Sequence, residues 1–397
     1  MVIFPMSPSR SETGLKQTSP HLRIQRRAEE HLRELEGEPA PSSALGWTCS
    51  YTPQELIMAA GYTPVRLPTA RAPGASPTQS YLPANLCPYV HRLLSTGLSG
   101  THPPWEGVVL AASCDPMRRL ADIWDLYLEP GFVYRLDVPR RKDRFALDYF
   151  LQVLQDMRLR LQDLTARQIS RQDLCRAASV QNRTRRIMRE LARLRAMPRP
   201  AISGAQFQRF ALCADSMDRE RFNQVGASFL ARIRKDLAQE RAGLPRARRP
   251  RVLLTGCLSE DSGLPALIEE AGAGVAADNL CSGMRQFQGQ VDENAGDPLE
   301  AIARRYLREL NCPRMVGRED RVRDLVSLAR RAGCDGVVLH TLTFCDLHQM
   351  DLPAQQQGLR EAGIPCLHLE REHLSGEDSG QLRTRVQAFV ELLRGRG

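Results

Sequence analysis

No Cys-x-x-Cys pair occurs in this chain, although it contains eleven cysteines. Closely spaced cysteine pairs are typical of zinc ribbons and of thioredoxin-like dithiols, so both classes are disfavoured. A metal site would have to be assembled from cysteines that lie far apart in the sequence. In a reducing compartment a disulfide framework is also disfavoured, which leaves metal ligands, a reactive thiol or buried core thiols as roles.

The sequence also lacks segments that would direct it to or through a membrane. No apolar run approaches the roughly 20 residues that cross a bilayer, and residues 1–41 contain no apolar core of a secretion signal. We therefore predict a cytoplasmic protein with no membrane partner. Two nucleotide-binding signatures are missing as well, since no Gly-x-Gly-x-x-Gly follows a predicted strand and no Walker A loop is present.

Aromatic residues make up only 6% of the chain, whereas Lys and Arg give a net charge of +9. Nucleic acid is one possible partner of a basic chain. Here, however, the basic residues are mixed with Glu and Asp along predicted helices, with few aromatics between them. We interpret them as a solvated, arginine-rich surface with no nucleic-acid partner. Binding of a phosphate-bearing ligand or of an acidic protein is the alternative.

The order of predicted elements indicates an α/β fold with parallel sheets and a helical insert. Strands alternate with helices in two regions, and strand signals vanish between them. No sequence repeat relates the two regions. The predicted organisation is a polar N-terminal tail with one helix at 1–41, a first α/β domain at 42–140, a helical insert and linker at 141–249, and a second α/β domain at 250–397.

The cysteines fall into three groups by their local context. A free cysteine is often simply a small buried hydrophobic residue, and we interpret Cys175, Cys213, Cys334 and Cys366 in this way, as core or surface thiols. Cys49, Cys87 and Cys345 instead lie at strand ends or helix starts among polar residues. The carboxyl ends of parallel strands form the ligand crevice in open α/β sheets, which favours a site for these three. The intermediate group is Cys114, Cys257, Cys281 and Cys312.

The stretch from Gly46 to Gly61 contains the first of these cysteines and a short predicted helix. Thr52 is a good N-cap, Pro53 fits the first turn, and Glu55 has the spacing of a capping box. Gly61 is expected to end the helix as the C′ residue. Cys49 would then precede a helix N-terminus, where free N–H groups favour a thiolate or a cluster bound through one.

Several segments together resemble the 2-hydroxyacyl-CoA dehydratase and benzoyl-CoA reductase family. The resemblance covers roughly residues 43–394. The matching segments are Gly46-Trp47-Thr48-Cys49-Ser50-Tyr51-Thr52-Pro53-Gln54-Glu55-Leu56 with Ala59-Ala60-Gly61, Cys87-Pro88-Tyr89-Val90, Cys114-Asp115 with Arg118-Arg119 and Trp124, Asn279-Leu280-Cys281-Ser282-Gly283-Met284-Arg285, Phe344-Cys345-Asp346, Gly363-Ile364-Pro365, and Gly380-Gln381-Leu382-Arg383-Thr384-Arg385-Val386-Gln387-Ala388-Phe389.

The resemblance implies two Rossmann-like domains with a helical part, in a subunit that pairs with an identical or homologous subunit. It also implies a 4Fe-4S cluster held by three cysteines, here Cys49, Cys87 and Cys345. Three ligands would leave one iron open to substrate or water. The implied activity is dehydration of a 2-hydroxyacyl-CoA through a ketyl radical, after an ATP-hydrolysing iron–sulfur activator has supplied one electron.

Two alternatives to this activity remain open. A related branch holds a double-cubane 8Fe-9S cluster and reduces small, unreactive substrates. Cys114, Cys281 and Cys312 lie in segments that resemble that branch, although the residues around Cys114 and Cys312 follow its pattern only in part. We predict the single cubane, with these three cysteines as possible extra ligands. The second alternative is a cluster-bearing partner subunit without catalysis of its own.

Glu55 has two interpretations. It could act as a general acid or base near the cluster, or it could serve only as the third residue of the capping box. His340, Thr341 and Asp346 follow or end a buried predicted strand, and we expect them to be polar neighbours of the cluster. His91 and His348 are interpreted as helix-face residues.

Overall fold

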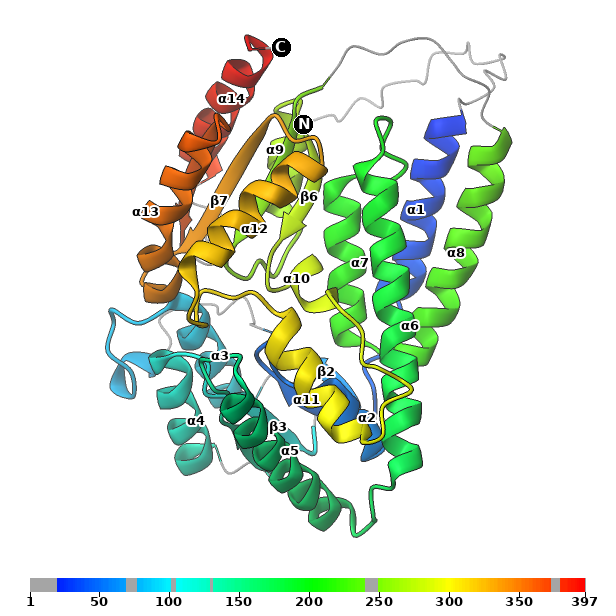
Figure 1. Ribbon diagram of the computed structural model, residues 1–397, viewed down its shortest axis with the longest axis vertical. Helices are drawn as coiled ribbons and strands as arrows, with labels where there is room; N and C mark the ends of the chain where they lie inside the picture. The colour runs from blue at the N-terminus through cyan, green and yellow to red at the C-terminus, as the bar shows by residue number, and fades with distance from the viewer. Residues whose placement is uncertain are drawn as a thin grey trace, which may run out of the picture.

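The computed structural model of the protein describes residues 20–68, 77–100, 105–128, 131–239, 249–372 and 379–396. It confirms the predicted α/β class, with two four-stranded sheets in which every strand pairing is parallel. Figure 1 shows the second sheet above the first, with a column of long helices along one side of both.

The first sheet has the strand order β2-β1-β3-β4. Its strands are β1 (Ala44–Trp47), β2 (Thr63–Arg66), β3 (Gly107–Ala111) and β4 (Val133–Leu136). Successive side chains of a strand face opposite sides of the sheet. On β3, Val108 and Leu110 accordingly pack with α3 (Pro88–Leu98) and α4 (Asp115–Tyr127), whereas Val109 and Ala111 belong to the core on the other face, with α2 (Gln54–Ala59) and α5 (Arg144–Thr165).

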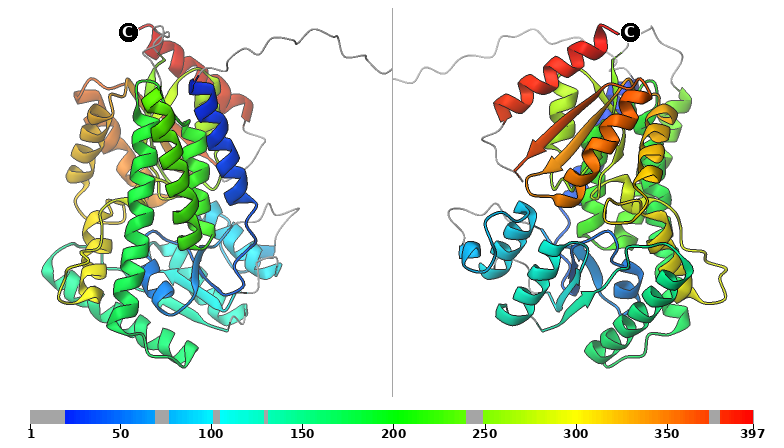
Figure 2. Two further views of the ribbon diagram at one scale, coloured as in Figure 1. Left: turned by 90° about the vertical axis from the view of Figure 1, so that its right-hand side faces the viewer. Right: turned by 60° about the vertical axis from the view of Figure 1, so that its left-hand side comes forward.

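The second sheet repeats this order as β6-β5-β7-β8, although the sequence shows no repeat. Its strands are β5 (Arg251–Gly256), β6 (Gly274–Asn279), β7 (Gly336–Leu342) and β8 (Cys366–Arg371). Helices α9 (Gly263–Glu270) and α14 (Ser379–Arg394) cover one face, and α12 (Arg318–Arg331) and α13 (Asp346–Glu361) the other (Figure 2). The central strand β7 is buried along its whole length, as the apolar residues at 336–339 predict, and the burial extends over His340 and Thr341.

The remaining long helices form a separate apolar core beside the sheets. They are α1 (Pro20–Glu36), α6 (Arg171–Ala196), α7 (Gly204–Ser216) and α8 (Arg219–Gln239). Serine caps start two of them, because Ser170 and Ser203 each form a reciprocal capping box with the residue three positions later. Three short elements complete the described residues: η1 (Pro77–Ser80), α10 (Met284–Phe287) and α11 (Pro298–Glu309).

Two helices connect the parts that the sequence separates. We expected residues 298–310 within the second α/β domain, but α11 packs its buried face on α5 in the core of the first sheet. Helix α6 reaches both sheets, since Arg185 pairs with Glu55 of α2 and Arg195 with Asp278 of β6. All four side chains are at most 3% exposed, so α6 is fixed to both halves by buried ion pairs.

Helix α13 contains His348, which we interpreted as a helix-face residue. Pro353 lies inside this helix, and its apolar residues do not form a regular stripe. Proline normally ends a helical pattern, so the sequence around Pro353 does not show how far the helix extends. None of the helices in the described ranges is long and apolar enough to cross a membrane.

Gly256 ends β5 in a conformation that other residues rarely adopt. Its φ is +137°, and a Cβ built there would lie 1.8 Å from the carbonyl oxygen of His340 on β7. The same carbonyl accepts the backbone hydrogen bond of Cys257, so this close approach fixes the position of that cysteine. Glycine is required because it alone has no Cβ.

Gly256→Ala is therefore expected to lower the free energy of unfolding by at least about 2 kcal/mol, from backbone strain and steric overlap together. Chemical denaturation monitored by circular dichroism measures the change. Gly380→Ala is the matched control, because a Cβ at Gly380 meets no atom within 4 Å. Equal stability of the two variants would contradict the strained approach at Gly256.

Candidate metal centre

Seven of the eleven cysteines gather where the carboxyl ends of the two sheets face each other. Five of them follow strands directly or within three residues: Cys49 after β1, Cys114 after β3, Cys257 after β5, Cys281 after β6 and Cys345 after β7. Cys87 precedes α3, and Cys312 follows α11. Because parallel strands end at the same edge of a sheet, two facing sheets bring thiols from the whole chain to one place.

Packing confirms that the two sheets meet at these residues. Cys257, Leu258 and Leu342 come from the second sheet region but belong to the apolar cluster built on β3, α3 and α4. Cys114, Cys281 and Cys345 pack against that same cluster. Cys49 and Cys312 pack against the core on the other face of the first sheet. The thiols therefore lie between the halves of the molecule, in a largely water-excluded layer.

The thiols interact with one another in two sets. In the first set, Cys312 and Cys49 interact electrostatically with Cys281. In the second, Cys257, Cys87 and Cys114 interact electrostatically with Cys345. Electrostatic interactions of Cys49 with Cys114, and of Cys281 with Cys345, connect the two sets.

These contacts separate the pKa values of the thiols. Interaction with the Cys257 thiol lowers the pKa of Cys345 to about 6, and interaction with the Cys312 thiol, with Arg285 and His348, holds the pKa of Cys281 well below its ordinary value. Burial raises the pKa of Cys87 and of Cys114 to about 12. Binding of a metal to these thiols would therefore release protons.

The donor set fits an iron–sulfur cluster better than a single metal ion. Within the ranges that the structure describes, no group of three His, Cys, Asp or Glu side chains is arranged around one ion. The sulfur ligands of a cubane need not converge on one point, since each binds a different iron and they lie roughly 6–7 Å apart. Thiolates are the ligands that such clusters use.

Arginines surround the thiols and supply positive charge. Arg285 is 2% exposed, and its Nη1 donates to the Sγ of Cys281 at 3.0 Å. Arg314 is also 2% exposed; it donates to the carbonyls of Ser113 and Val138, and its charge opposes the rise in the pKa of Cys49. Buried cations of this kind would offset the negative charge of a thiolate-bound cluster.

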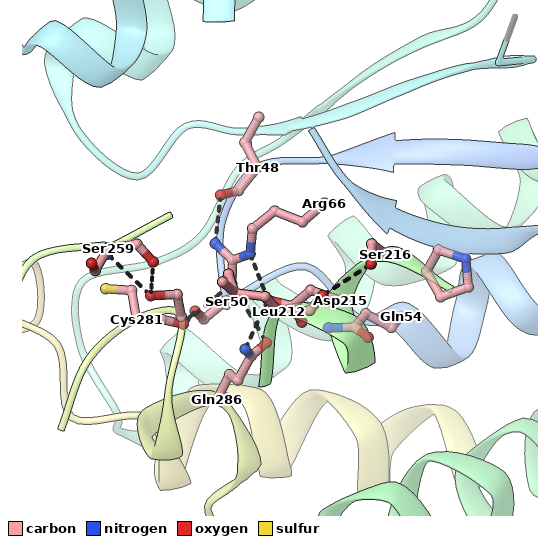
Figure 3. A network of polar contacts seen from close by, with 12 residues as sticks. Thr48, Ser50, Gln54, Arg66, Leu212, Asp215, Ser216, Ser259, Cys281 and Gln286 are labelled. Carbon is pink, nitrogen blue, oxygen red and sulfur yellow. Dashed lines mark hydrogen bonds and ion pairs between the residues drawn. The ribbon is translucent and has the colours of Figure 1, made fainter. Parts of the chain in front are cut away.

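A polar network fixes the loop that carries Cys281 (Figure 3). Arg66, on β2, donates to the carbonyl oxygens of Thr48 and Cys281 and pairs with Asp215 of α7 at 2.8 Å. Ser50 donates to the same Cys281 carbonyl at 2.9 Å. The loops after β1 and β6, one from each sheet, are thus joined directly beside Cys49 and Cys281.

The residues around Cys345 also confine it. Phe344 has a φ of +58°, which is uncommon for a residue other than glycine, and this turn leads from β7 into α13. Cys345 occupies the N-cap position of α13. We interpreted His348 only as a helix-face residue; it lies in the first turn of α13, is 8% exposed, and interacts electrostatically with Cys281.

The capping box predicted for α2 is wrong. Its N-cap is Pro53 with no side-chain cap, and the hydroxyl of Thr52 has no hydrogen-bond partner among the described residues. Gly61 does follow the end of the helix, with a φ of +93°. Cys49 is separated from α2 by a turn in which the Thr52 N–H donates to the Cys49 carbonyl.

Glu55 is held by other partners. Its carboxylate accepts from Arg185 and from the Tyr306 hydroxyl, both at 2.7 Å, and it is fully buried. Burial raises the pKa of Glu55, but Arg185, Arg305 and Tyr306 outweigh burial and hold this pKa below its ordinary value. The general acid or base role of Glu55 stays a prediction.

The other predicted residues have ordinary positions. His340 is 1% exposed within β7, Thr341 hydrogen-bonds to His368 of β8, and Asp346 starts α13. His91 lies on α3 and contacts Thr78 and Pro83. Four thiols lie away from the seven: Cys175 on α6, Cys213 in the core of the long helices, and Cys334 and Cys366 against the second sheet.

Cys257 is the residue that we did not assign to the site. It is 3% exposed, accepts a hydrogen bond from the Leu342 N–H at 3.4 Å, and contacts Cys345 through its own thiol. Its signal in the sequence was its position directly after a buried strand, the same signal that favoured Cys345.

The fold and the site define an α/β protein with a thiol-rich centre between two parallel sheets. The chain belongs to the 2-hydroxyglutaryl-CoA dehydratase D-component family, which matches residues 49–393. This confirms the family inferred from the sequence motifs.

Individual relatives are distant but match over most of their length. The chain is 25% identical to the lactoyl-CoA dehydratase subunit beta of Anaerotignum propionicum, over 88% of this chain and 91% of the relative. It is 24% identical to the (R)-phenyllactyl-CoA dehydratase beta subunit of Clostridium sporogenes, over 90% and 93%. It is also 24% identical to one subunit of the benzoyl-CoA reductase of Thauera aromatica, over 84% and 85%.

Proposed function

We propose that this chain is the cluster-binding subunit of a cytoplasmic redox enzyme, and that an ATP-hydrolysing iron–sulfur activator supplies its electrons. The observation that supports the proposal is the convergence of seven thiols at the facing edges of the two sheets. The relatives are named as subunits, so we also propose that the chain works with a second subunit.

The number of thiols favours the double-cubane cluster over the single cubane that we predicted. One cubane with an open iron uses three thiolates, and two cubanes would use six. Cys49, Cys281 and Cys312 form one set that could hold a cubane. Cys87 and Cys345, with either Cys114 or Cys257, could hold the other. Such a cluster supplies low-potential electrons for reduction of a small, unreactive substrate.

The residues of the chain have three tasks in this proposal. The strand ends hold the thiols in fixed positions, and the apolar cluster of α3 and α4 excludes water from them. The positive charges of Arg285 and Arg314 would offset the negative charge of a cluster bound by these thiolates. The network of Arg66, Ser50 and Asp215 keeps the two sheets at a constant separation.

Dehydration of a 2-hydroxyacyl-CoA is the second candidate function, because two of the relatives are named as dehydratase subunits. In that case a single 4Fe-4S cluster would be held by Cys49, Cys87 and Cys345, and the remaining thiols of the site would have no ligand role.

Anaerobic purification followed by counting iron and sulfide per chain distinguishes the two candidates. We expect about eight irons per chain for the double cubane and about four for the single cubane. An electron paramagnetic resonance spectrum of the reduced protein provides a second readout. Absence of iron under strict anaerobiosis would contradict both candidates.

A further inference from the structure

A polar cavity of about 430 Å³ opens beside the thiols of the first set. Its lining residues come from α11, α12 and α13 and from the carboxyl ends of β5 and β6. Its inner end is lined by Thr255, which is next to last in β5, and by Asn279, which ends β6. A second cavity of similar volume adjoins it and shares Lys142, Asn311 and Asp324.

Positive charge dominates the lining of this cavity. Its cationic side chains are Lys142, Arg285, Arg308, Arg321 and Arg331, whereas its carboxylates are Glu309 and Asp324. Three of the arginines have protein partners, since Arg285 binds Cys281, Arg321 forms a bidentate pair with Asp351, and Arg331 donates to the hydroxyl of Ser327 in its own helix. Burial is the main reason that the pKa of Lys142 is lowered, while Asp324 and Glu309 raise this pKa and Arg321 lowers it.

Arg308 and Arg331 are the cations best placed to receive a ligand. Arg308 lies in the last turn of α11 and Arg331 in the last turn of α12, and both are exposed. Their positions bring two guanidinium groups to one polar cavity from separate helices. Guanidinium groups bind carboxylates and phosphates strongly, because their N–H donors match the geometry of those oxygens.

The cavity reaches side chains that interact with the cysteine site, although no cysteine is among the described residues that line it. Arg285 lines it while donating to the sulfur of Cys281, and His348 lines it while contacting the same cysteine. Asn311 and Pro313, the neighbours of Cys312 in the chain, line it as well. A molecule in the cavity would therefore be separated from Cys281 by the side chains of Arg285 and His348, and it would contact the sequence neighbours of Cys312.

We propose that this cavity binds an anionic group of the substrate, a carboxylate or a phosphate, and holds it beside Cys281 and Cys312. This proposal rests on the proposed function, because that function is what makes the bound molecule a substrate. The scarcity of apolar lining, limited largely to Leu325, Leu328 and Pro313, favours a small hydrophilic molecule over a long acyl chain.

Isothermal titration calorimetry of the anaerobically purified protein tests the site. The probes are inorganic phosphate, succinate and coenzyme A, each at constant ionic strength. We expect at least one probe to bind, and Arg308→Gln and Arg331→Gln each to weaken that binding by about threefold to tenfold. Arg304→Gln and Arg330→Gln are matched controls on the same two helices, because neither residue lines the cavity.

The pattern of binding identifies the source of the anion. Binding of coenzyme A that depends on Arg308 and Arg331 would assign the phosphate to a coenzyme-bound substrate. Binding of succinate or phosphate alone would assign the anion to the small molecule itself. No binding of any probe, or equal weakening by the control variants, would overturn the proposal. The iron content of the same samples tests the proposed function, whereas binding of the probes tests the cavity. The two results can differ, because a chain without iron could still bind the anion.

Discussion

Cys345→Ala is expected to remove most of the iron from the anaerobically purified protein. Cys345 is at the centre of the site, because it interacts electrostatically with Cys257, Cys87, Cys114 and Cys281. Loss of its sulfur would leave one iron without a protein ligand at a buried position. Cys49→Ala and Cys87→Ala are expected to have the same effect, and iron and sulfide per chain are the measurement.

Two variants serve as controls for this experiment. Cys213 is buried among the long helices, and Cys366 lies at the start of β8. Both lie away from the seven thiols, so Cys213→Ala and Cys366→Ala should retain full iron content. Circular dichroism shows whether each variant is folded, and Cys345→Ser provides a variant of similar size. Equal iron in all of these proteins would show that the ligand assignment is wrong.

Glu55→Gln is expected to lower the free energy of unfolding by about 3–5 kcal/mol, because it leaves the charge of Arg185 buried and unpaired. Both side chains are 0% exposed in the wild-type pair. Denaturant unfolding at neutral pH measures the change. Glu220→Gln is the control, since Glu220 forms an exposed pair with Arg176 and such pairs contribute less than about 1 kcal/mol.

The pH dependence of this difference follows from the lowered pKa of Glu55. A carboxylate with a lower pKa in the folded state stabilises the protein above its unfolded pKa, and this contribution is lost as pH falls through the folded value. The gap between wild type and Glu55→Gln should therefore be full near pH 7 and shrink below about pH 4.

The same variant separates the two interpretations of Glu55. A structural role predicts lower stability, with turnover of the remaining folded protein unchanged. A role as general acid or base predicts loss of turnover even at temperatures where the variant is fully folded. Unchanged stability together with unchanged turnover would contradict both roles.

The sequence by itself determined the class of fold and the family. Alternating strands and helices predicted the two parallel sheets, because burial on both faces leaves continuous apolar runs such as that of β7. Position after a strand end predicted Cys49 and Cys345 as site residues, since strand ends mark the ligand crevice. These signals are local, because each depends only on residues that are close together in the sequence.

Only the tertiary structure decided which thiols share the site. Cys257 and Cys281 come close to Cys345 and Cys49 because two separate sheets face each other, and no local pattern encodes that arrangement. For the same reason, the sequence did not predict that Arg185 is the partner of Glu55. A capping box is visible in four residues, whereas Arg185 lies 130 positions away on α6. The ion pair of Glu55 with Arg185 joins residues that are far apart in the sequence. The packing of α11 on the first sheet does the same, so local sequence patterns predict neither of them.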